Sequence, residues 1–257
     1  MNLKSSGKNT AAVILAGGKG KRMASKLPKV LHKIAGQPMI YYTLQTINKL
    51  DLAQLCVVVG YRSELVKKRI ATFSECEFIL QNDPLGTGHA VHCALNKLNH
   101  KITTILVTNG DDSAFYSPQT LINFISSHKK SKAVISMVTL LISGENKLGR
   151  IIRDKEGNFQ QILEAAKYFS SGLQSNEINC GAYIFDVKWL KQNIDKILLN
   201  EAGEYYLTDL LNIAHQNHHT INLFQLVKKN EWIGINTRKE LKYANQEMRR
   251  KTNAGKI

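Results

Sequence analysis

The first residues that could do chemistry form a glycine-rich segment, Leu15-Ala16-Gly17-Gly18-Lys19-Gly20-Lys21-Arg22-Met23. The glycines leave backbone N–H groups open to phosphate oxygens, and the planar guanidinium of Arg22 can pair with a phosphate. A dinucleotide fingerprint beginning at Gly18 would need glycine in place of Met23, and a Walker A loop would need Ser or Thr in place of Arg22. The segment therefore predicts phosphate binding, although its residue types alone also allow a plain glycine-rich turn.

Two charged residues could act on the same phosphates. Lys29 follows Pro28 shortly after the loop, and it could fold back onto a triphosphate or be an ordinary surface lysine. Asp111 ends an apolar run, and a carboxylate at the end of a strand is well placed to hold Mg²⁺ against phosphates. Asp112 could compete with it as a ligand.

The elements that must position these residues alternate in type. Short apolar runs predict buried parallel strands, and amphipathic stretches between them predict helices. The expected strands are 11–16, 55–60, 78–80 and 104–108, and the expected helices are 38–50, 63–72, 87–98 and 118–128. This alternation predicts an α/β fold with a doubly wound sheet.

The second half changes character. Strands are expected at 133–142, 149–153, 159–164, 178–185 and 221–227, with a hairpin turn at Glu156-Gly157-Asn158. Helices are expected at 186–194, 206–216 and 237–250, the last capped by Thr237. We expect a tail over 1–10, one domain over 11–236 and a helix with a tail over 237–257.

The stretch LAGGKGKRM…LPKVLHKIAGQPM resembles the opening of bacterial N-acetylglucosamine-1-phosphate uridylyltransferases, the nucleotidyltransferase half of a bifunctional enzyme. The resemblance extends in seven ordered blocks from about Val13 to about Leu241. It implies a Rossmann-like mixed sheet of the nucleotide-diphospho-sugar transferase (GT-A-like) type. Within it, 11–130 would bind the nucleotide and a smaller β-rich part, 131–236, would bind the sugar. Because no hexapeptide repeat follows, the acetyltransferase β-helix of that family is not expected.

The resemblance also implies roles for single residues. Arg22 and Lys29 would be catalytic, the loop from Leu15 to Gly20 would bind the nucleotide, and Asp111 with Asn236 would hold Mg²⁺. Gln81, whose amide offers a donor and an acceptor to a uracil edge, would read the base with Gly86 and Thr87, and Thr87 could also cap a helix. Gly149, Glu164 and Asn179 would bind the sugar.

Three positions depart from the family pattern. Asn109 replaces an aromatic residue, Leu148 replaces a tyrosine, and Lys167 stands one place later than the family lysine. These changes leave the sugar and the base open.

Composition excludes few function classes. The net charge of +15 is spread along the chain and does not by itself distinguish nucleic acid, an anionic membrane surface and small anionic substrates. Because no nucleic-acid-binding motif accompanies the charge, small-molecule substrates are expected and nucleic acid is not. The four cysteines form no C-x-x-C pair and predict free thiols in a reducing compartment. No signal peptide and no membrane span are seen, so a cytoplasmic enzyme is expected, and its oligomeric state is left open.

The reaction implied is in-line attack of N-acetylglucosamine 1-phosphate on UTP, giving UDP-N-acetylglucosamine and pyrophosphate. One alternative is a nucleotidyltransferase for another sugar or base. A second is a non-catalytic module that binds a sugar nucleotide.

Overall fold

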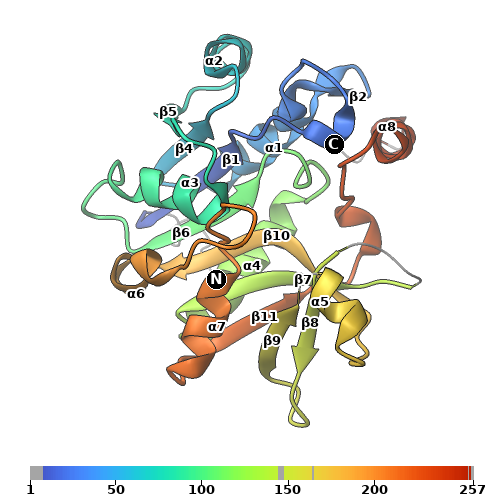
Figure 1. Ribbon diagram of the computed structural model, residues 1–257. Helices are drawn as coiled ribbons and strands as arrows, with labels where there is room; N and C mark the ends of the chain where they lie inside the picture. The colour runs from blue at the N-terminus through green and yellow to red at the C-terminus, as the bar shows by residue number, and fades with distance from the viewer. Residues whose placement is uncertain (1–7, 144–147, 164, 254, 256–257) are drawn as a thin grey trace.

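Short apolar runs form the parallel strands at the centre of the sheet, as the sequence predicts. In this computed structural model, which describes residues 8–143, 148–163, 165–253 and 255, they are β1 (Thr10–Ala16), β4 (Gln54–Val59), β5 (Glu77–Leu80) and β6 (Thr104–Asn109). β1 pairs in parallel with β4 and with β6, and β4 pairs in parallel with β5. β1 is therefore an interior strand, flanked by β4 and β6, and the loop at its carboxyl end has neighbouring strands on both sides (Figure 1).

The second half of the chain extends the same sheet with strands of both directions. They are β7 (Ile135–Leu141), β8 (Arg150–Arg153), β9 (Phe159–Leu163), β10 (Glu177–Asp186) and β11 (Ile221–Gln225). The order is β11-β7-β10-β6-β1-β4-β5, with β10 antiparallel to both β6 and β7. β8 and β9 form the predicted hairpin beside β10, and Gly157 adopts a φ of +85° at its turn. The predicted mixed sheet is confirmed.

Helices cover both faces of the sheet. Ala12 and Ile14 of β1 pack in a core with α1 (Met39–Ile47), α2 (Ser63–Ile70) and α4 (Pro118–Ser131). Ala11 and Val13 face the other way, onto α3 (Gly86–Leu95), α6 (Val187–Asn193) and α7 (Asp209–Gln216). Each fully buried Val, Leu or Ile contributes about 1.5–3 kcal/mol through removal from water, so the sheet is fixed from both sides.

The last helix, α8 (Arg238–Asn253), joins a smaller core beside the first loop of the chain. Its Ala244 and Met248 are fully buried against Ile34 of the short ribbon formed by β2 (Lys33–Ile34) and β3 (Gln37–Pro38). The remaining elements are α5 (Ala165–Ser170) and the 3-10 turns Lys21–Met23, Lys29–Leu31, Asn48–Leu50, Ile194–Lys196 and Lys229–Glu231. α8 therefore lies beside the β2–β3 ribbon, far from it in the sequence (Figure 1).

The structure also describes the cysteines and the lengths of the helices. All four cysteines are free. No helix among the described residues is long and apolar enough to cross a membrane.

Candidate active site

The glycine-rich loop leaves the sheet directly after β1. Gly18 and Lys19 are exposed, whereas Ala16 before them is buried. Gly20 has a φ of +67°, and a Cβ on it would lie 2.8 Å from the Cβ of Lys29. Glycine is needed there for its left-handed backbone and for the close passage of the Lys29 side chain. The exposed main chain of the glycine-rich loop and the side chain of Lys29 therefore lie next to each other.

Arg22 is held by a turn that is anchored on both sides. The neighbouring Met23 is buried, and Arg238 of α8 donates to the carbonyl oxygens of Met23 and Ala24 at 3.2 and 2.9 Å. The exposed guanidinium of Arg22 donates from Nη2 to Oδ1 of Asn236 at 2.8 Å. Although Arg22 is exposed, its turn is held by Arg238 and its guanidinium is held by Asn236.

Lys29 folds back over the loop and is not an ordinary surface lysine. It begins a 3-10 turn whose other residues, Val30 and Leu31, are buried. Its ammonium forms an ion pair with Asp111 and donates to Oδ1 of Asn236 at 2.8 Å. The Lys29 and Asp111 side chains are only 14% and 17% exposed, so solvent screens this pair less than a surface pair.

Asp111 is placed by a tightly packed glycine at the end of β6. The N–H of Gly110 donates to the carbonyl oxygen of Leu15 at 2.9 Å, which ties the turn to β1. A Cβ on Gly110 would come within 3.2–3.4 Å of the side chains of Val30, Ile40 and Ile14. The main chain before Asp111 consequently has little freedom to move.

Asn236 precedes α8 and is positioned by the cap of that helix. The carboxylate of Glu240 accepts hydrogen bonds from the backbone N–H of Asn236 at 2.7 Å and of Thr237 at 2.8 Å. The hydroxyl of Thr237 accepts from the N–H of Glu240 at 3.2 Å, so Thr237 and Glu240 form a reciprocal capping box. The predicted Thr237 cap is confirmed, and it also fixes the backbone of Asn236.

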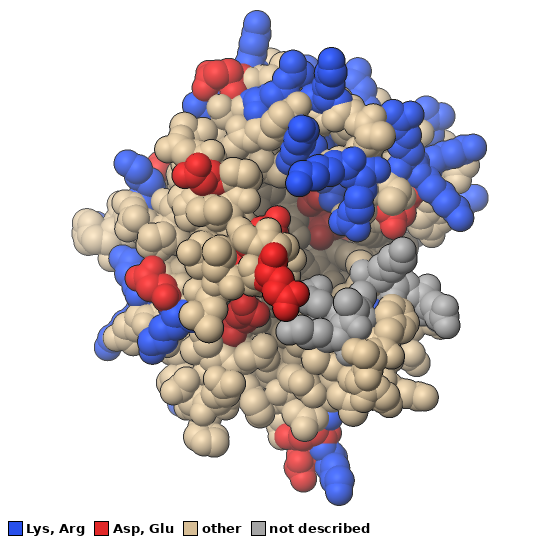
Figure 2. All heavy atoms as spheres, viewed as in Figure 1, with Lys and Arg blue, Asp and Glu red and all other residues tan. Residues whose placement is uncertain are grey.

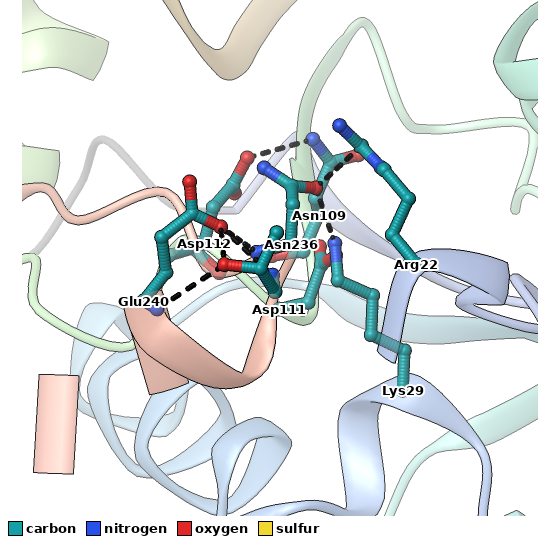
Figure 3. A network of polar contacts seen from close by, with 9 residues as sticks. Arg22, Lys29, Asn109, Asp111, Asp112, Asn236 and Glu240 are labelled. Carbon is teal, nitrogen blue, oxygen red and sulfur yellow. Dashed lines mark hydrogen bonds and ion pairs between the residues drawn. The ribbon is translucent and has the colours of Figure 1, made fainter. Parts of the chain in front are cut away.

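Four side chains from distant segments meet at this point. Figure 3 shows Arg22 and Lys29 reaching Asn236 and Asp111 from one side, while Glu240 supports Asn236 from the other. Arg22 and Asn236 are 214 positions apart in the chain. In the space-filling view the face is hollowed, and Lys and Arg side chains gather along one rim of the hollow (Figure 2). The arrangement can hold a polyanion together with a cation.

A second polar pair, Asn109 and Asp112, flanks the same turn. Nδ2 of Asn109 donates to Oδ2 of Asp112 at 3.1 Å, and Oδ1 of Asp112 is buried without a partner among the described residues. A Cβ on Gly181, which has a φ of +69°, would lie 2.5 Å from Nδ2 of Asn109 and 2.7 Å from Oδ2 of Asp112. Burial, followed by the nearby charge of Asp111, raises the pKa of Asp112 well above its usual value.

Gln81 is buried at the end of β5, and its amide has a defined orientation. Nε2 donates to the carbonyl oxygen of Gly86 at 3.0 Å and lies 3.3 Å from Nδ1 of His89. A carbonyl oxygen can only accept, so the NH₂ group of Gln81 must face Gly86. Oε1 points to the glycine-rich loop, where it would be 2.9 Å from a Cβ on Gly17.

Gly86 and Thr87 are used within the protein. Gly86 has a φ of +92°, and a Cβ on it would lie 2.7 Å from the carbonyl oxygen of Tyr205. The hydroxyl of Thr87 accepts the N–H of Leu207 at 3.0 Å. The prediction that Thr87 caps α3 is wrong, because the cap position belongs to Leu85 and no side chain bonds the first turn. The chain at Tyr205 leaves no room for a side chain at position 86, and the backbone of Leu207 is hydrogen-bonded by the hydroxyl at position 87.

The predicted sugar-binding residues are only partly described. Ile178 of β10 pairs with Arg150 of β8, so the antiparallel register sets Gly149 opposite Asn179. Oδ1 of Asn179 accepts the N–H of Gly181 at 2.9 Å. Gly181 in turn packs against the side chain of Asn109, so Asn179 lies close to that residue. Glu164 lies outside the described residues.

Sequence reasoning missed two residues of this site. Arg238 holds the Arg22 turn, and Glu240 holds Asn236. The T-x-x-E spacing of Thr237 and Glu240 is the signal of a capping box and could have identified Glu240. Arg238 has no such signal, because its contact depends on tertiary packing.

Comparisons with known proteins identify the family of the chain. The family model described as nucleotidyl transferase matches residues 11–251. The bifunctional protein GlmU of Bacillus cereus (strain G9842) is 36% identical over 246 residues, which are 95% of this chain and 53% of that protein. The protein of the same name from Exiguobacterium sibiricum is 37% identical over 246 residues, 95% of this chain and 54% of that protein. The chain spans about half the length of these relatives.

A solved UDP-glucose pyrophosphorylase complexed with UDP-glucose has a similar fold. It superposes with a TM-score of 0.78 at 18% identity, covering 94% of this chain and 99% of that chain. This likeness confirms the predicted fold type, and the GlmU relatives confirm the resemblance drawn from the motifs. The match over 11–251 shows that the chain belongs to the nucleotidyl transferase family.

Proposed function

We propose that this nucleotidyltransferase acts on a sugar 1-phosphate, joining UTP and N-acetylglucosamine 1-phosphate into UDP-N-acetylglucosamine with release of pyrophosphate. The observation that carries the proposal is the meeting of Arg22, Lys29, Asp111 and Asn236 beside the glycine-rich loop. Two cationic groups, a carboxylate and exposed main-chain N–H groups are what a triphosphate with its metal needs. The resemblance of the motifs to uridylyltransferases favours a UDP-sugar product, and the solved protein that shares the fold holds UDP-glucose.

The reaction needs charge neutralisation more than proton transfer. A phosphate oxygen of the sugar 1-phosphate would attack the α-phosphorus of UTP, and the bond from that phosphorus to the bridging oxygen would break. The electron pair leaves with pyrophosphate, and the nucleophile is already an anion, so no general base is required. Arg22 and Lys29 would bind the α-phosphate and the departing pyrophosphate, where the charge of the transition state develops.

Mg²⁺ fits the oxygens that face Lys29. The Asp111 carboxylate and Oδ1 of Asn236 contact one ammonium group, so both oxygens already point at a single cation. No group of three His, Cys, Asp or Glu residues in the described ranges could hold a metal, so phosphate oxygens would supply the other ligands. When bound, the metal would neutralise phosphate charge and orient the two substrates.

The orientation of Gln81 supports a uracil base. One N–H of its amide donates to the carbonyl oxygen of Gly86, and Oε1 points to the glycine-rich loop. Oε1 can accept from the N3–H of uracil while the second N–H can donate to a uracil carbonyl oxygen. Gln81 thus keeps the donor and acceptor pair expected for a uracil edge.

The sugar is supported less directly. Gly149 directly precedes β8, which pairs with β10 next to Asn179, and Asn179 bonds Gly181 beside the Asn109–Asp112 pair, where Asn109 departs from the family pattern. This departure favours one alternative, a nucleotidyltransferase for another sugar 1-phosphate.

A substrate panel tests the proposal. Pyrophosphate release would be measured with UTP, CTP, dTTP and GTP against N-acetylglucosamine, glucosamine and glucose 1-phosphates. We expect the highest kcat/KM for UTP with N-acetylglucosamine 1-phosphate. A different preferred pair would replace the substrate assignment, and no release with any pair would refute the enzymatic function.

Two variants test the site. Arg22→Ala and Asp111→Asn should each lower kcat by about 100-fold, because loss of one preorganised group costs about 3 kcal/mol of barrier. Arg249→Ala, which removes an exposed arginine of α8, is the matched control and should leave kcat unchanged. An unchanged kcat in Arg22→Ala or Asp111→Asn, with unfolding like that of the wild type, would contradict the assignment.

A further inference from the structure

We propose that Asp112 is a positioning residue that fixes the amide of Asn109, so that Oδ1 of Asn109 accepts a hydrogen bond from a hydroxyl group of the bound sugar nucleotide. The inference rests on the proposed function and adds a specificity-determining pair to it. It starts from two polar residues that share the turn of Asp111 and contact neither Arg22 nor Lys29 by a hydrogen bond within the described chain.

The amide of Asn109 has a defined orientation. Nδ2 of Asn109 donates to Oδ2 of Asp112 at 3.1 Å. A carboxyl oxygen accepts this N–H whether or not the acid is ionised, so the NH₂ group of Asn109 must face Asp112. Within the described residues Oδ1 of Asn109 accepts no hydrogen bond, and it is left as an acceptor on a half-buried side chain.

Asp112 is held in a position that is unfavourable for a carboxyl group. Its Oδ1 is buried without a partner among the described residues, and such an atom is costly unless it serves the site. Asp112 also has little space to move, because Gly181 lies directly behind it and behind Asn109. The pair is thereby held between β6 and the bulge of β10.

Asn109 lies where the two parts of the expected substrate site meet. Asn109 ends β6 two residues before Asp111, and Gly181 lies two residues after Asn179. Ala182 of β10 pairs with Thr108 of β6, so Asn109 lies beside Gly181, between the expected metal ligand and the expected sugar-binding residue. Figure 3 shows Asn109 next to Asp111 and Asp112. A ligand crossing this junction carries hydroxyl groups on its ribose and on its hexose, and either can donate.

The experiment compares four variants: Asp112→Ala, Asp112→Asn, Asn109→Ala and the double variant Asn109→Ala/Asp112→Ala. Initial rates of pyrophosphate release and the affinity for UDP-N-acetylglucosamine by calorimetry would both be measured. Thr43→Val is the matched control, because the Thr43 hydroxyl bonds that of Ser113 at 2.9 Å and supports the same turn from behind.

Asp112→Asn keeps an acceptor and should bind like the wild type. Asp112→Ala should weaken ligand affinity and kcat/KM by about fivefold to tenfold, the size of one lost neutral hydrogen bond. In the Asn109→Ala background Asp112→Ala should add nothing further. Thr43→Val should lower the thermal midpoint without changing ligand affinity.

Deoxy analogues identify the donor. The penalty of Asp112→Ala should vanish with 2′-deoxyuridine triphosphate if the ribose donates, or with a deoxyhexose 1-phosphate if the hexose donates. Equal losses in Asp112→Ala and Asp112→Asn, additive losses in the double variant, or a penalty unchanged by every analogue would overturn the inference while the proposed function stands. A wild-type protein that neither turns over nor binds the ligand would overturn both.

Discussion

Replacing Lys29 by methionine should strengthen metal binding in the absence of nucleotide while abolishing turnover. The Lys29 ammonium contacts the Asp111 carboxylate and Oδ1 of Asn236, the two oxygens proposed to hold Mg²⁺. A divalent ion can reach both oxygens only if the ammonium leaves them. Methionine has a similar length and flexibility but no charge, so it removes the competitor and keeps the packing.

The magnitude follows from the contacts that are broken. A hydrogen bond to a charged group contributes about 1.5–3 kcal/mol, and 1.4 kcal/mol corresponds to a tenfold change in affinity. Displacing Lys29 breaks one ion pair and one further charge-assisted contact, both partly buried. We therefore expect Lys29→Met to bind metal at least about tenfold more tightly than the wild type.

Titration of the nucleotide-free protein with Mn²⁺, followed by electron paramagnetic resonance, measures this affinity directly. Lys33→Met, which neutralises an exposed lysine on β2, is the matched control and should bind Mn²⁺ like the wild type. Asp111→Asn should bind it more weakly. An unchanged or weaker affinity in Lys29→Met would refute the idea that the lysine competes with the metal.

Three further predictions concern the framework of the site. Gly86→Ala should lower the free energy of unfolding by at least about 2 kcal/mol in denaturant titration, because it combines a φ of +92° with a Cβ 2.7 Å from the carbonyl oxygen of Tyr205; a loss below half that size would contradict the close packing. Glu240→Ala should cost about 1 kcal/mol of stability and also lower kcat, because Asn236 loses its backbone support, whereas Glu247→Ala on the same helix should leave kcat unchanged. His128 hydrogen-bonds Ser136 at 2.7 Å, and burial lowers its pKa to about 4. The folded state therefore resists protonation that the unfolded state accepts below about pH 6.5, and up to about 3 kcal/mol of stability should be lost between pH 6.5 and pH 4. His128→Gln should flatten that pH dependence of the unfolding free energy, and an equally steep dependence in the variant would argue against it.

The central strands could be predicted because their residues leave few alternatives. Runs such as 55–59 and 104–108 are apolar on both faces, and only a covered parallel strand buries them fully. The turn at Gly157 and the cap at Thr237 were equally clear, since each depends on local chemistry of a few neighbouring residues.

The sequence could not reveal contacts that arise between distant segments. The pattern of residues 178–185 predicts a strand, but it does not predict that β10 runs antiparallel between β6 and β7. Thr87 looked like a cap, but the chain at Leu207 takes its hydroxyl. The binding roles assigned to single residues, from Arg22 to Asn236, stay predictions, although four of these residues do meet in space.

The antiparallel strand β10 joins the two parts of the sheet by direct hydrogen bonding to β6. Neighbouring strands are about 4.8 Å apart, so Asn109 and the segment around Gly181 are separated by one ladder spacing and not by a hinge. Rigid-body closure of two lobes would have to tear that ladder, and it is therefore a poor way to bring two substrates together here. Motion that admits and releases the substrates is therefore expected in the loops at the carboxyl ends of the strands, while the ladder between β6 and β10 keeps the nucleotide-binding and sugar-binding parts at a constant distance.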